Sequence, residues 1–269
     1  MFYEGTEKRL LICTQSLDLF SIQENFWQAL VNESGADILS SISNSQIKAY
    51  LLSESSLFIW KNRLLLITCG NTQLVKAALF IQQQLTKKEI STLLFQRHHP
   101  LQPALQYSNF EQDSLLLTKQ FKGQQQHWRA DYQGDMFLFG DVSTSALPAH
   151  SIYMLHELSG KLAVTLQQQT VDKVTMLDLL QLEHFFDDLQ VDHFSFDPKG
   201  YSLNAIRQGE YLTIHLTPEE KSTYLSVETS FTIKQCHSLI THLKVLFSPK
   251  QTKEIHFTPT DKTLNINVY

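Results

Sequence analysis

The distribution of apolar residues constrains the fold of this chain more than any other feature. Short apolar runs come in clusters, and two segments with helical periodicity follow such clusters, at residues 74–85 and 233–247. In both segments the apolar side chains recur every three or four positions, so each segment predicts a helix with a single apolar stripe. A helix of this kind must bury its stripe against a sheet or another helix. Clusters of strands followed by such helices therefore predict an α+β fold with antiparallel sheets.

The expected strands are short and rich in residues that suit a pleated surface. They cover residues 49–53, 57–60, 64–68, 136–139, 211–215, 224–229, 254–257 and 264–268. Two further helices are expected. One begins at Ser21, whose spacing to Glu24 fits a capping box, and the other spans residues 177–188.

The two halves of the chain share one pattern, because each runs through strands and then a striped helix. This pattern indicates an internal duplication, although no sequence repeat of fixed period accompanies it. We expect one domain over residues 1–269, with halves at about 1–145 and 146–269 that are joined through the turn-rich segment 141–150.

The composition argues against several classes of protein. With 22 basic against 27 acidic side chains, a basic surface for nucleic acid is not expected. The cysteines Cys13, Cys69 and Cys236 form an odd set without a CxxC pair, which argues against a disulfide scaffold or a zinc module. The longest apolar run, residues 77–81, is far too short for a membrane helix, and the first residues lack the features of a signal peptide. We expect a cytoplasmic protein that contacts no membrane.

Common catalytic motifs are missing from the sequence, which has no phosphate-binding glycine loop, no GxSxG and no HExxH. The adjacent His98 and His99 precede Pro100 in what we interpret as a surface loop. No other ligands stand at metal-binding spacing beside them, so we expect no metal site.

Four segments place polar or ionisable residues within or beside runs that should be half buried. They are residues 2–8, 52–58, 68–70 and 196–219. Each has a simple structural interpretation when it is taken alone. These interpretations are a solvated terminus, a turn between strands, a buried inert cysteine and a structural histidine.

Taken together and in this order, the four segments resemble the eukaryotic-type S-adenosylmethionine decarboxylase proenzymes. These pyruvoyl-dependent enzymes make the aminopropyl donor for spermidine and spermine synthesis. The shared motifs are EGTEK (4–8), LSESS (52–56), TCG (68–70), GYSLN (200–204), TIHLTPE (213–219) and YLSVET (224–229). The resemblance implies a four-layer α/β/β/α sandwich, with two antiparallel sheets face to face and helices outside.

The resemblance implies that the chain cuts itself between Glu54 and Ser55. The Ser55 hydroxyl would attack the carbonyl of Glu54 and convert the peptide bond to an ester. Elimination and hydrolysis would leave chain 1–54 and chain 55–269, the second headed by a pyruvoyl group made from Ser55. Ser202 would support ester formation, and His215 would remove the α-proton of residue 55.

In the mature enzyme, the pyruvoyl group would form a Schiff base with S-adenosylmethionine and accept the electrons that decarboxylation releases. Neither a metal nor pyridoxal phosphate is implied. Cys69 would then return a proton to the substrate. The other residues that the resemblance assigns to the site are Tyr3 and Phe196 (adenine stacking), Glu219 (ribose hydroxyls), Leu52, and Glu4 and Glu7 (near the sulfonium).

The chain departs from the mammalian-type members at the acidic cluster that binds the activating diamine putrescine. Only Glu228 matches this cluster, and the other positions fall on Leu11, Ile152 and Pro148. A buried dication would have too few carboxylates to offset its desolvation, so we expect processing that does not depend on putrescine. Arg9 lies in the region where plant-type members use a basic side chain instead.

Two alternatives stay open from the sequence. One is a pyruvoyl-dependent decarboxylase of another amino acid, although Tyr3, Phe196 and Glu219 suit an adenosine-shaped substrate. The other is a non-catalytic regulatory paralogue, which would be expected to lose the chemistry of Ser55. A monomer and a homodimer are equally compatible with the sequence.

Overall fold

The computed structural model describes residues 7–85, 89–100, 102–128, 134–140, 147–197, 199–218, 223–260 and 264–269. These residues form two compact units. The N-terminal unit contains the described residues up to Leu147 together with Pro259–Leu264, and the C-terminal unit contains Pro148–Thr258 and Asn265–Tyr269. Residues 141–146 of the expected linker lie outside the described part.

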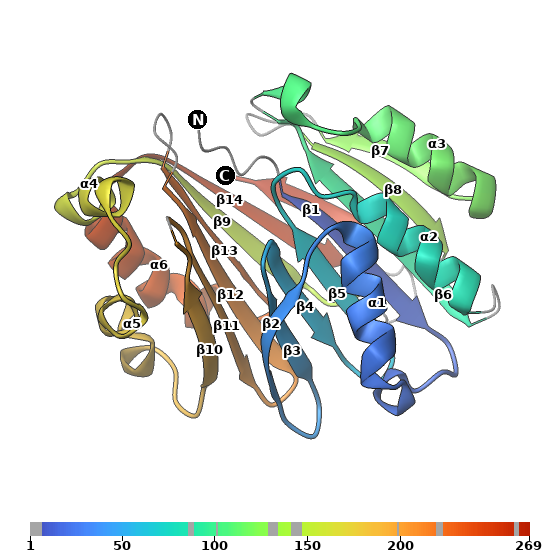
Figure 1. Cartoon of the computed structure of the whole chain (residues 1–269), viewed down its shortest axis with the longest axis horizontal. Helices are drawn as coiled ribbons and strands as arrows, with labels where there is room; N and C mark the ends of the chain where they lie inside the picture. The colour runs from blue at the N-terminus through green and yellow to red at the C-terminus, as the bar shows by residue number, and fades with distance from the viewer. Residues whose placement is uncertain are drawn as a thin grey trace. The chain divides into compact units, whose positions relative to one another are not determined.

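The N-terminal unit is built on an antiparallel sheet of eight described strands (Figure 1). In chain order, these are β1 (Lys8–Thr14), β2 (Ile38–Ser43), β3 (Lys48–Leu52), β4 (Ser55–Ile59), β5 (Arg63–Thr68), β6 (Ile90–His98), β7 (Gln124–Trp128) and β8 (Gly134–Gly140). Their order across the sheet is β2-β3-β4-β5-β1-β6-β8-β7. The helices are α1 (Glu24–Ser34), α2 (Leu74–Gln84) and α3 (Phe110–Gln120), with 3-10 turns η1 (Leu19–Ser21) and η2 (Pro103–Leu105).

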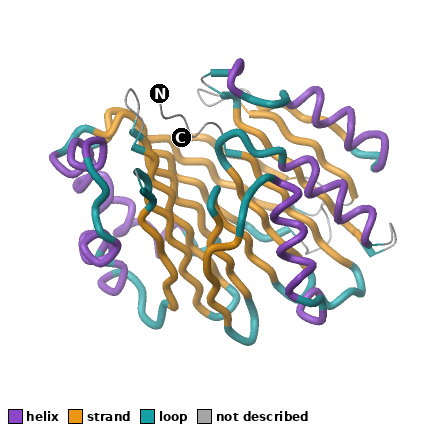
Figure 2. The backbone as a smooth tube through the Cα atoms, in the orientation of Figure 1, coloured by secondary structure: helices purple, strands orange, loops and turns teal. Residues whose placement is uncertain are grey.

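The helices of this unit lie along one face of its sheet (Figure 2). Trp27 and Leu30 of α1 and Ala78 of α2 belong to one buried cluster with Leu10 and Leu57 of the sheet. Burial of a large apolar side chain contributes roughly 1.5–3 kcal/mol, so this one-sided cluster accounts for the single apolar stripe of each helix.

The C-terminal unit is built on an antiparallel sheet of seven described strands in the order β10-β11-β12-β13-β9-β14-β15. They are β9 (His150–Leu158), β10 (Gln190–Ser195), β11 (Tyr201–Arg207), β12 (Glu210–Thr217), β13 (Tyr224–Thr229), β14 (Pro249–Pro259) and β15 (Leu264–Val268). Helices α4 (Lys161–Gln168), α5 (Lys173–Leu180) and α6 (Ile233–Phe247) accompany this sheet, with a 3-10 turn at η3 (Leu182–His184). Leu239 and Leu243 of α6 pack in one cluster with Leu203 and Ile214 of the strands.

The two sheets share one strand order. In each unit the first strand, β1 or β9, lies between the strand that precedes the striped helix and the strand that follows it. These neighbours are β5 and β6 in one unit and β13 and β14 in the other. A duplicated unit would give this order, and the duplication itself stays a prediction.

All eight expected strands are confirmed in β3, β4, β5, β8, β12, β13, β14 and β15, and both striped helices are confirmed as α2 and α6. The expected ranges 49–53, 57–60 and 74–85 each run one residue past the end of β3, β4 and α2. The capping box at Ser21 is wrong. Helix α1 begins at Glu24 after Gln23, and Ser21 ends the preceding 3-10 turn, where its hydroxyl donates to the Asp18 carbonyl at 2.6 Å.

The helix expected over 177–188 is also wrong in its bounds. Helix α5 ends at Leu180 because Gln181 adopts a left-handed conformation with φ of 51°. None of the helices in the described ranges is long and apolar enough to cross a membrane.

Candidate active site

The predicted cleavage site lies in a tight hairpin of the N-terminal unit. Strand β3 ends at Leu52, β4 begins at Ser55, and these residues are Cα partners, so Ser53 and Glu54 form the turn. Ser55 is 3% exposed and has a backbone φ of 134°. Only glycine adopts this φ readily, and it costs another residue about 1–3 kcal/mol. The peptide bond between Glu54 and Ser55 therefore adjoins a strained residue.

The carbonyl oxygen of Glu54 accepts two hydrogen bonds from one residue. The Cys69 backbone N–H donates to it at 3.0 Å, and the Cys69 thiol donates to it at 3.4 Å. Strand pairing explains this contact, because β4 and β5 bring Ser55 opposite Thr68, and Cys69 follows Thr68. Two donors aimed at one carbonyl oxygen can stabilise the oxyanion that forms when that carbonyl is attacked.

The side chain of Glu54 faces a hollow beside the hairpin. A cavity of about 560 Å³ is lined by Glu54, Thr72 and Tyr107, among others. Burial raises the pKa of the Glu54 carboxyl, and the nearby charge of Lys8 acts in the opposite direction. Sequence reasoning did not single out Lys8, although it is the last residue of the EGTEK motif.

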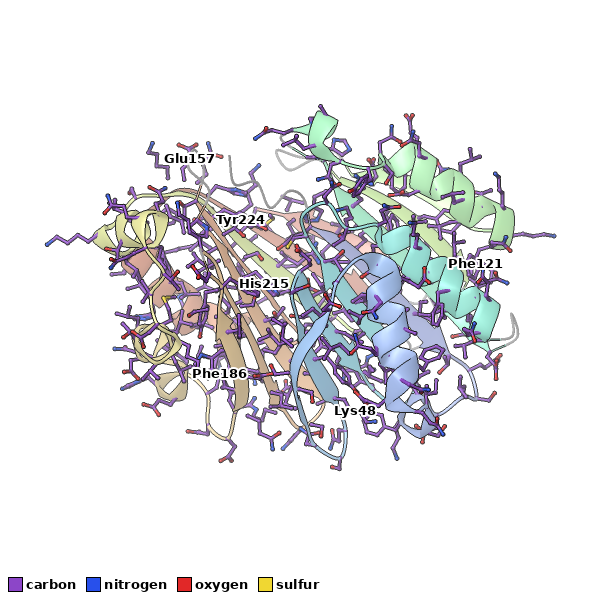
Figure 3. The ribbon with its side chains drawn as sticks, in the orientation of Figure 1. Lys48, Phe121, Glu157, Phe186, His215 and Tyr224 are labelled. Carbon is purple, nitrogen blue, oxygen red and sulfur yellow. The ribbon has the colours of Figure 1, made fainter. Side chains whose placement is uncertain are left out.

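His215 of the C-terminal unit is held at both ring nitrogens (Figure 3 labels its position). Its Nδ1 lies 2.9 Å from the hydroxyl of Ser202, which is its partner across β11 and β12, and its Nε2 lies 2.8 Å from the hydroxyl of Thr213. All three side chains are buried. Sequence reasoning missed Thr213, although its spacing of two residues from His215 places both on one face of a strand.

Phe196 lies in a turn that leads into β11. Its backbone N–H donates to the Gly200 carbonyl at 2.9 Å, and Gly200 has φ of 119°, which favours glycine. The ring of Phe196 meets that of Phe194 edge to face, with centroids 4.9 Å apart. Phe194 is a neighbour that sequence reasoning did not select.

Glu7 and Arg9 form a buried ion pair on β1 and the residue before it. The guanidinium donates to the Glu7 carboxylate at 2.6 Å, and its other terminal nitrogen lies 3.3 Å from His98 Nε2. The expected surface loop is confirmed for the exposed His99 but is wrong for His98, because His98 ends β6 and is 0% exposed. His98 instead continues the pairing of β6 with β1, since its N–H donates to the Glu7 carbonyl.

Of the positions that align with the putrescine-binding cluster, Leu11 lies in the N-terminal unit, and Pro148, Ile152 and Glu228 lie in the C-terminal unit. Leu11 and Ile152 are buried apolar residues, and Pro148 is half-buried. Glu228 is buried and accepts a hydrogen bond from the Tyr211 hydroxyl at 3.0 Å.

The other candidate residues are placed as follows. Leu52 is buried in the core cluster beneath the helices of the N-terminal unit. Tyr3, Glu4 and Glu219 lie outside the described residues. The structure thus brings Glu54, Ser55 and Cys69 together in one unit, and Ser202 and His215 together in the other.

The three cysteines form no disulfide and are buried. Burial raises the pKa of Cys13 and of Cys236 to about 12. Within the ranges that the structure describes, no three histidine, cysteine or acidic side chains gather as a metal site would require.

These features can be set beside known proteins. A family model described as adenosylmethionine decarboxylase matches residues 1–267. The chain belongs to the adenosylmethionine decarboxylase family. A family relative from Trypanosoma cruzi, an S-adenosylmethionine decarboxylase proenzyme, is 27% identical over 296 residues, which cover 96% of this chain and 76% of the relative. A proenzyme of the same description from Dictyostelium discoideum is 28% identical over 265 residues, which cover 91% and 68% of the two chains.

A solved structure also shares the fold of this adenosylmethionine decarboxylase family chain. The Trypanosoma brucei AdoMetDC-delta26 monomer matches it with a TM-score of 0.58 and 23% sequence identity, covering 75% of this chain and 79% of that one. The two antiparallel sheets and six α-helices of the described residues are therefore the adenosylmethionine decarboxylase fold.

Proposed function

We propose that this chain is a proenzyme that cuts itself between Glu54 and Ser55 and then decarboxylates S-adenosylmethionine with the pyruvoyl group formed at residue 55. The observation that carries this proposal is the pair of hydrogen bonds from Cys69 to the Glu54 carbonyl oxygen, at 3.0 and 3.4 Å. The hydroxyl that would attack this carbonyl belongs to the strained residue Ser55.

The first step is the conversion of the peptide bond to an ester. The Ser55 Oγ forms a bond to the Glu54 carbonyl carbon, the bond from that carbon to the Ser55 nitrogen breaks, and the hydroxyl proton ends on this nitrogen. Negative charge develops on the Glu54 oxygen, where the Cys69 N–H and thiol stabilise it. Cleavage of the peptide bond also frees the Ser55 backbone from the turn, so the strain favours the reaction. We propose that Ser202 assists this step.

The second step is elimination, for which we propose His215 as the base. It removes the α-proton of residue 55 while the bond from Cβ to the ester oxygen breaks, and Glu54 leaves as a carboxylate. A neutral imidazole has one nitrogen that accepts a proton, and the hydroxyls of Ser202 and Thr213 hold the ring in place. The dehydroalanine that is left tautomerises to an imine, which water hydrolyses to the pyruvoyl group and ammonia.

The buried hairpin suits a group made from its own backbone, since Ser55 and the donors of Cys69 are already in contact with the bond that changes. Once formed, the pyruvoyl group supplies the electron acceptor that decarboxylation needs. We propose that Cys69 then donates a proton to the substrate carbon.

We propose that the same site recognises the adenosine and sulfonium groups. Phe196 and Tyr3 would stack on adenine, Glu219 would bind the ribose hydroxyls, and Leu52 would line the site. Two contacts of Phe196 support this role. Its backbone hydrogen bond to Gly200 holds the turn, and its edge-to-face contact with Phe194 orients the ring before substrate binds. Glu4 and Glu7 would lie near the sulfonium, and the Arg9 guanidinium supplies a counter-charge to the buried Glu7 carboxylate.

The intact mass of the denatured protein tests self-cleavage. We expect two chains, residues 1–54 and a pyruvoyl-blocked chain from residue 55, whereas Ser55→Ala should give one uncut chain. A wild-type chain that stays uncut would overturn the proposed function. Release of labelled carbon dioxide from carboxyl-labelled S-adenosylmethionine, but not from ornithine or arginine, would separate this substrate from another amino acid.

We also propose that putrescine does not activate this protein. Leu11 and Ile152 offer no charge to a diamine, and the Glu228 carboxylate already has the Tyr211 hydroxyl as a partner. Self-cleavage and decarboxylation should therefore proceed at the same rates with and without putrescine. A rate that rises at micromolar putrescine would contradict this proposal.

A further inference from the structure

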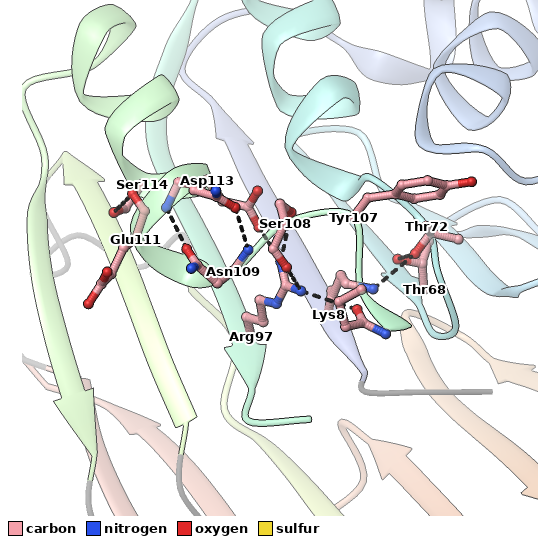
Figure 4. Close-up of polar contacts among 12 residues, drawn as sticks. Lys8, Thr68, Thr72, Arg97, Tyr107, Ser108, Asn109, Glu111, Asp113 and Ser114 are labelled. Carbon is pink, nitrogen blue, oxygen red and sulfur yellow. Dashed lines mark hydrogen bonds and ion pairs between the residues drawn. The ribbon is translucent and has the colours of Figure 1, made fainter. Parts of the chain in front are cut away.

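Lys8 is a buried cation of β1 that the steps above do not use. Its side chain is 1% exposed, and its ammonium donates to the Gly70 carbonyl at 2.8 Å. The ammonium also lies 3.4 Å from the hydroxyl of Thr72 (Figure 4). Within the described residues, no carboxylate lies within ion-pair distance of this ammonium. A buried charge without a counter-charge is costly, so its presence at this position calls for an explanation.

The charged and titratable groups around Lys8 come from four elements. Burial, and then the positive charge of Arg97 on β6, lower the pKa of Lys8 to about 8. Negative charge on Cys69 after β5, on Asp113 of α3 and on Glu54 in the β3–β4 turn would raise it. Two of these groups, Cys69 and Glu54, belong to the predicted cleavage site.

Lys8 is also part of a network that fixes the turn after Cys69. The Gly70 carbonyl accepts a second hydrogen bond from Gln106 Nε2 at 3.1 Å, and Gln106 Oε1 in turn accepts from Arg97 at 3.1 Å. Arg97 is anchored by Asp113 at 2.6 Å. Gly70 has φ of 63°, so a glycine suits the bend at which these donors converge.

The turn that Lys8 holds is the one that presents the oxyanion donors. Gly70 directly follows Cys69, whose N–H and thiol both point at the Glu54 carbonyl oxygen. A shift of this turn would move both donors away from that oxygen. The Thr72 hydroxyl supports the same turn, because it donates to the Cys69 carbonyl at 2.8 Å.

We propose that Lys8 is a positioning residue for self-cleavage. Its ammonium holds Gly70 so that Cys69 stays aimed at the Glu54 oxygen, and its charge is offset when negative charge forms there. That charge appears first on the oxyanion and then on the main-chain carboxylate of Glu54, which elimination releases. The inference rests on the proposed self-cleavage, and it adds a role for the lysine of the EGTEK motif.

The test compares the rates of self-cleavage of the wild type and Lys8→Met by the intact mass of samples taken after synthesis. Because removal of one oxyanion donor slows such reactions by roughly 10²–10³, loss of the group that positions both donors should slow cleavage by roughly 10- to 100-fold. Lys8→Gln keeps a donor without the charge and should cleave at an intermediate rate. Lys119→Met makes the same change at an exposed lysine of α3 and should cleave at the wild-type rate.

Two further measurements separate positioning from a purely structural role. In the uncut Ser55→Ala background, Lys8→Met should leave the midpoint of thermal unfolding unchanged or raise it, since it removes a buried charge that has no carboxylate partner among the described residues. In the His215→Ala background, which should accumulate the ester, Lys8→Met should lower the amount of chain that hydroxylamine cleaves at residue 55.

Either of two results would overturn the inference about Lys8 while leaving the proposed function intact. The first is Lys8→Met cleaving within twofold of the wild type. The second is slower cleavage accompanied by a lower unfolding midpoint and an unchanged yield of ester. An uncut wild-type chain would overturn both proposals.

Discussion

At the scale of single residues, Ser55 carries the hydroxyl that we propose as nucleophile and has a backbone conformation that residues with a side chain disfavour. The φ of 134° is imposed by a two-residue turn between β3 and β4, and the neighbouring strands keep Ser55 in the sheet. Such strain persists only where the surrounding structure enforces it. Here it occurs at the bond that we propose is broken.

The strain at Ser55 predicts an unusual order of stability for two uncut variants. Ser55→Gly should be more stable than Ser55→Ala by about 1 kcal/mol, because relief of roughly 1–3 kcal/mol of strain exceeds the entropy cost of glycine. Urea unfolding of the two variants measures the difference. Equal stability, or a more stable alanine variant, would show that residue 55 is not strained.

Lys8 predicts a pH dependence of stability at the same scale. The folded protein loses the Lys8 proton near pH 8 and the unfolded chain loses it near the ordinary pKa of 10.5. Between these values the unfolded state binds more protons, so the Lys8 contribution to the free energy of unfolding rises with pH, by roughly 3 kcal/mol in all.

Chemical denaturation from pH 7 to 11 would measure this effect in the uncut Ser55→Ala protein. Other groups titrate in the same range, so the informative quantity is the difference between Ser55→Ala and Ser55→Ala/Lys8→Met. As the pH rises, the free energy of unfolding of Ser55→Ala should increase relative to that of Ser55→Ala/Lys8→Met. A difference that is independent of pH would mean that the pKa of Lys8 is not lowered.

At the scale of elements, the same capping-box spacing occurs near the starts of α1, α3 and α6 but caps only α3 and α6. Thr232 caps α6 through a complete capping box with Gln235, and Asn109 caps α3 in the same way with Gln112. Ser21 and Glu24 have the same spacing, yet Ser21 lies in a 3-10 turn before α1. The spacing is therefore necessary for a box but does not decide where a helix begins.

This difference predicts unequal effects of two similar substitutions. Thr232→Ala should lower the free energy of unfolding by about 1 kcal/mol, because it removes the cap of a helix that packs in the core of the C-terminal unit. Ser21→Ala, at an exposed position that caps no helix, should change it by less than about 0.5 kcal/mol. Urea unfolding of both variants in the Ser55→Ala background would test this, and a larger loss at Ser21 would contradict it.

At the scale of the whole molecule, strand order decides what self-cleavage does to the protein. A cut between Glu54 and Ser55 separates β1, α1, β2 and β3 from the remaining elements. Within the sheet, however, β1 lies between β5 and β6, and β3 pairs with β4. Chain 1–54 is thus held to chain 55–269 by the hydrogen-bonded pairing of these strands and by packing in the shared core.

We therefore predict that the two chains stay together after cleavage. Mature protein should elute from gel filtration as one species and resolve into two chains only under denaturing conditions. Release of chain 1–54 from the native protein would contradict the strand order, because loss of β1 would divide the sheet of the N-terminal unit. The uncut Ser55→Ala protein is the control for elution volume.

Much of the fold follows from local pattern. Strands with clear apolar character and helices with one apolar stripe are recognisable because each buries one face against a core. Strand β1 was not expected, since the charged Lys8 and Arg9 open a strand that is buried along its whole length. A central strand covered on both faces loses the alternation by which a strand is recognised.

The motifs that carry Ser55, Cys69 and His215 identify the family, and the local apolar pattern identifies the main elements on which these residues lie. The folded chain adds the φ of Ser55, the contact of Cys69 with the Glu54 carbonyl, and the burial of Lys8 without a carboxylate partner among the described residues. The physical reason is that these features depend on strand register and on contacts between residues far apart in the chain. A local pattern specifies which face a side chain takes, but not which distant backbone group it meets.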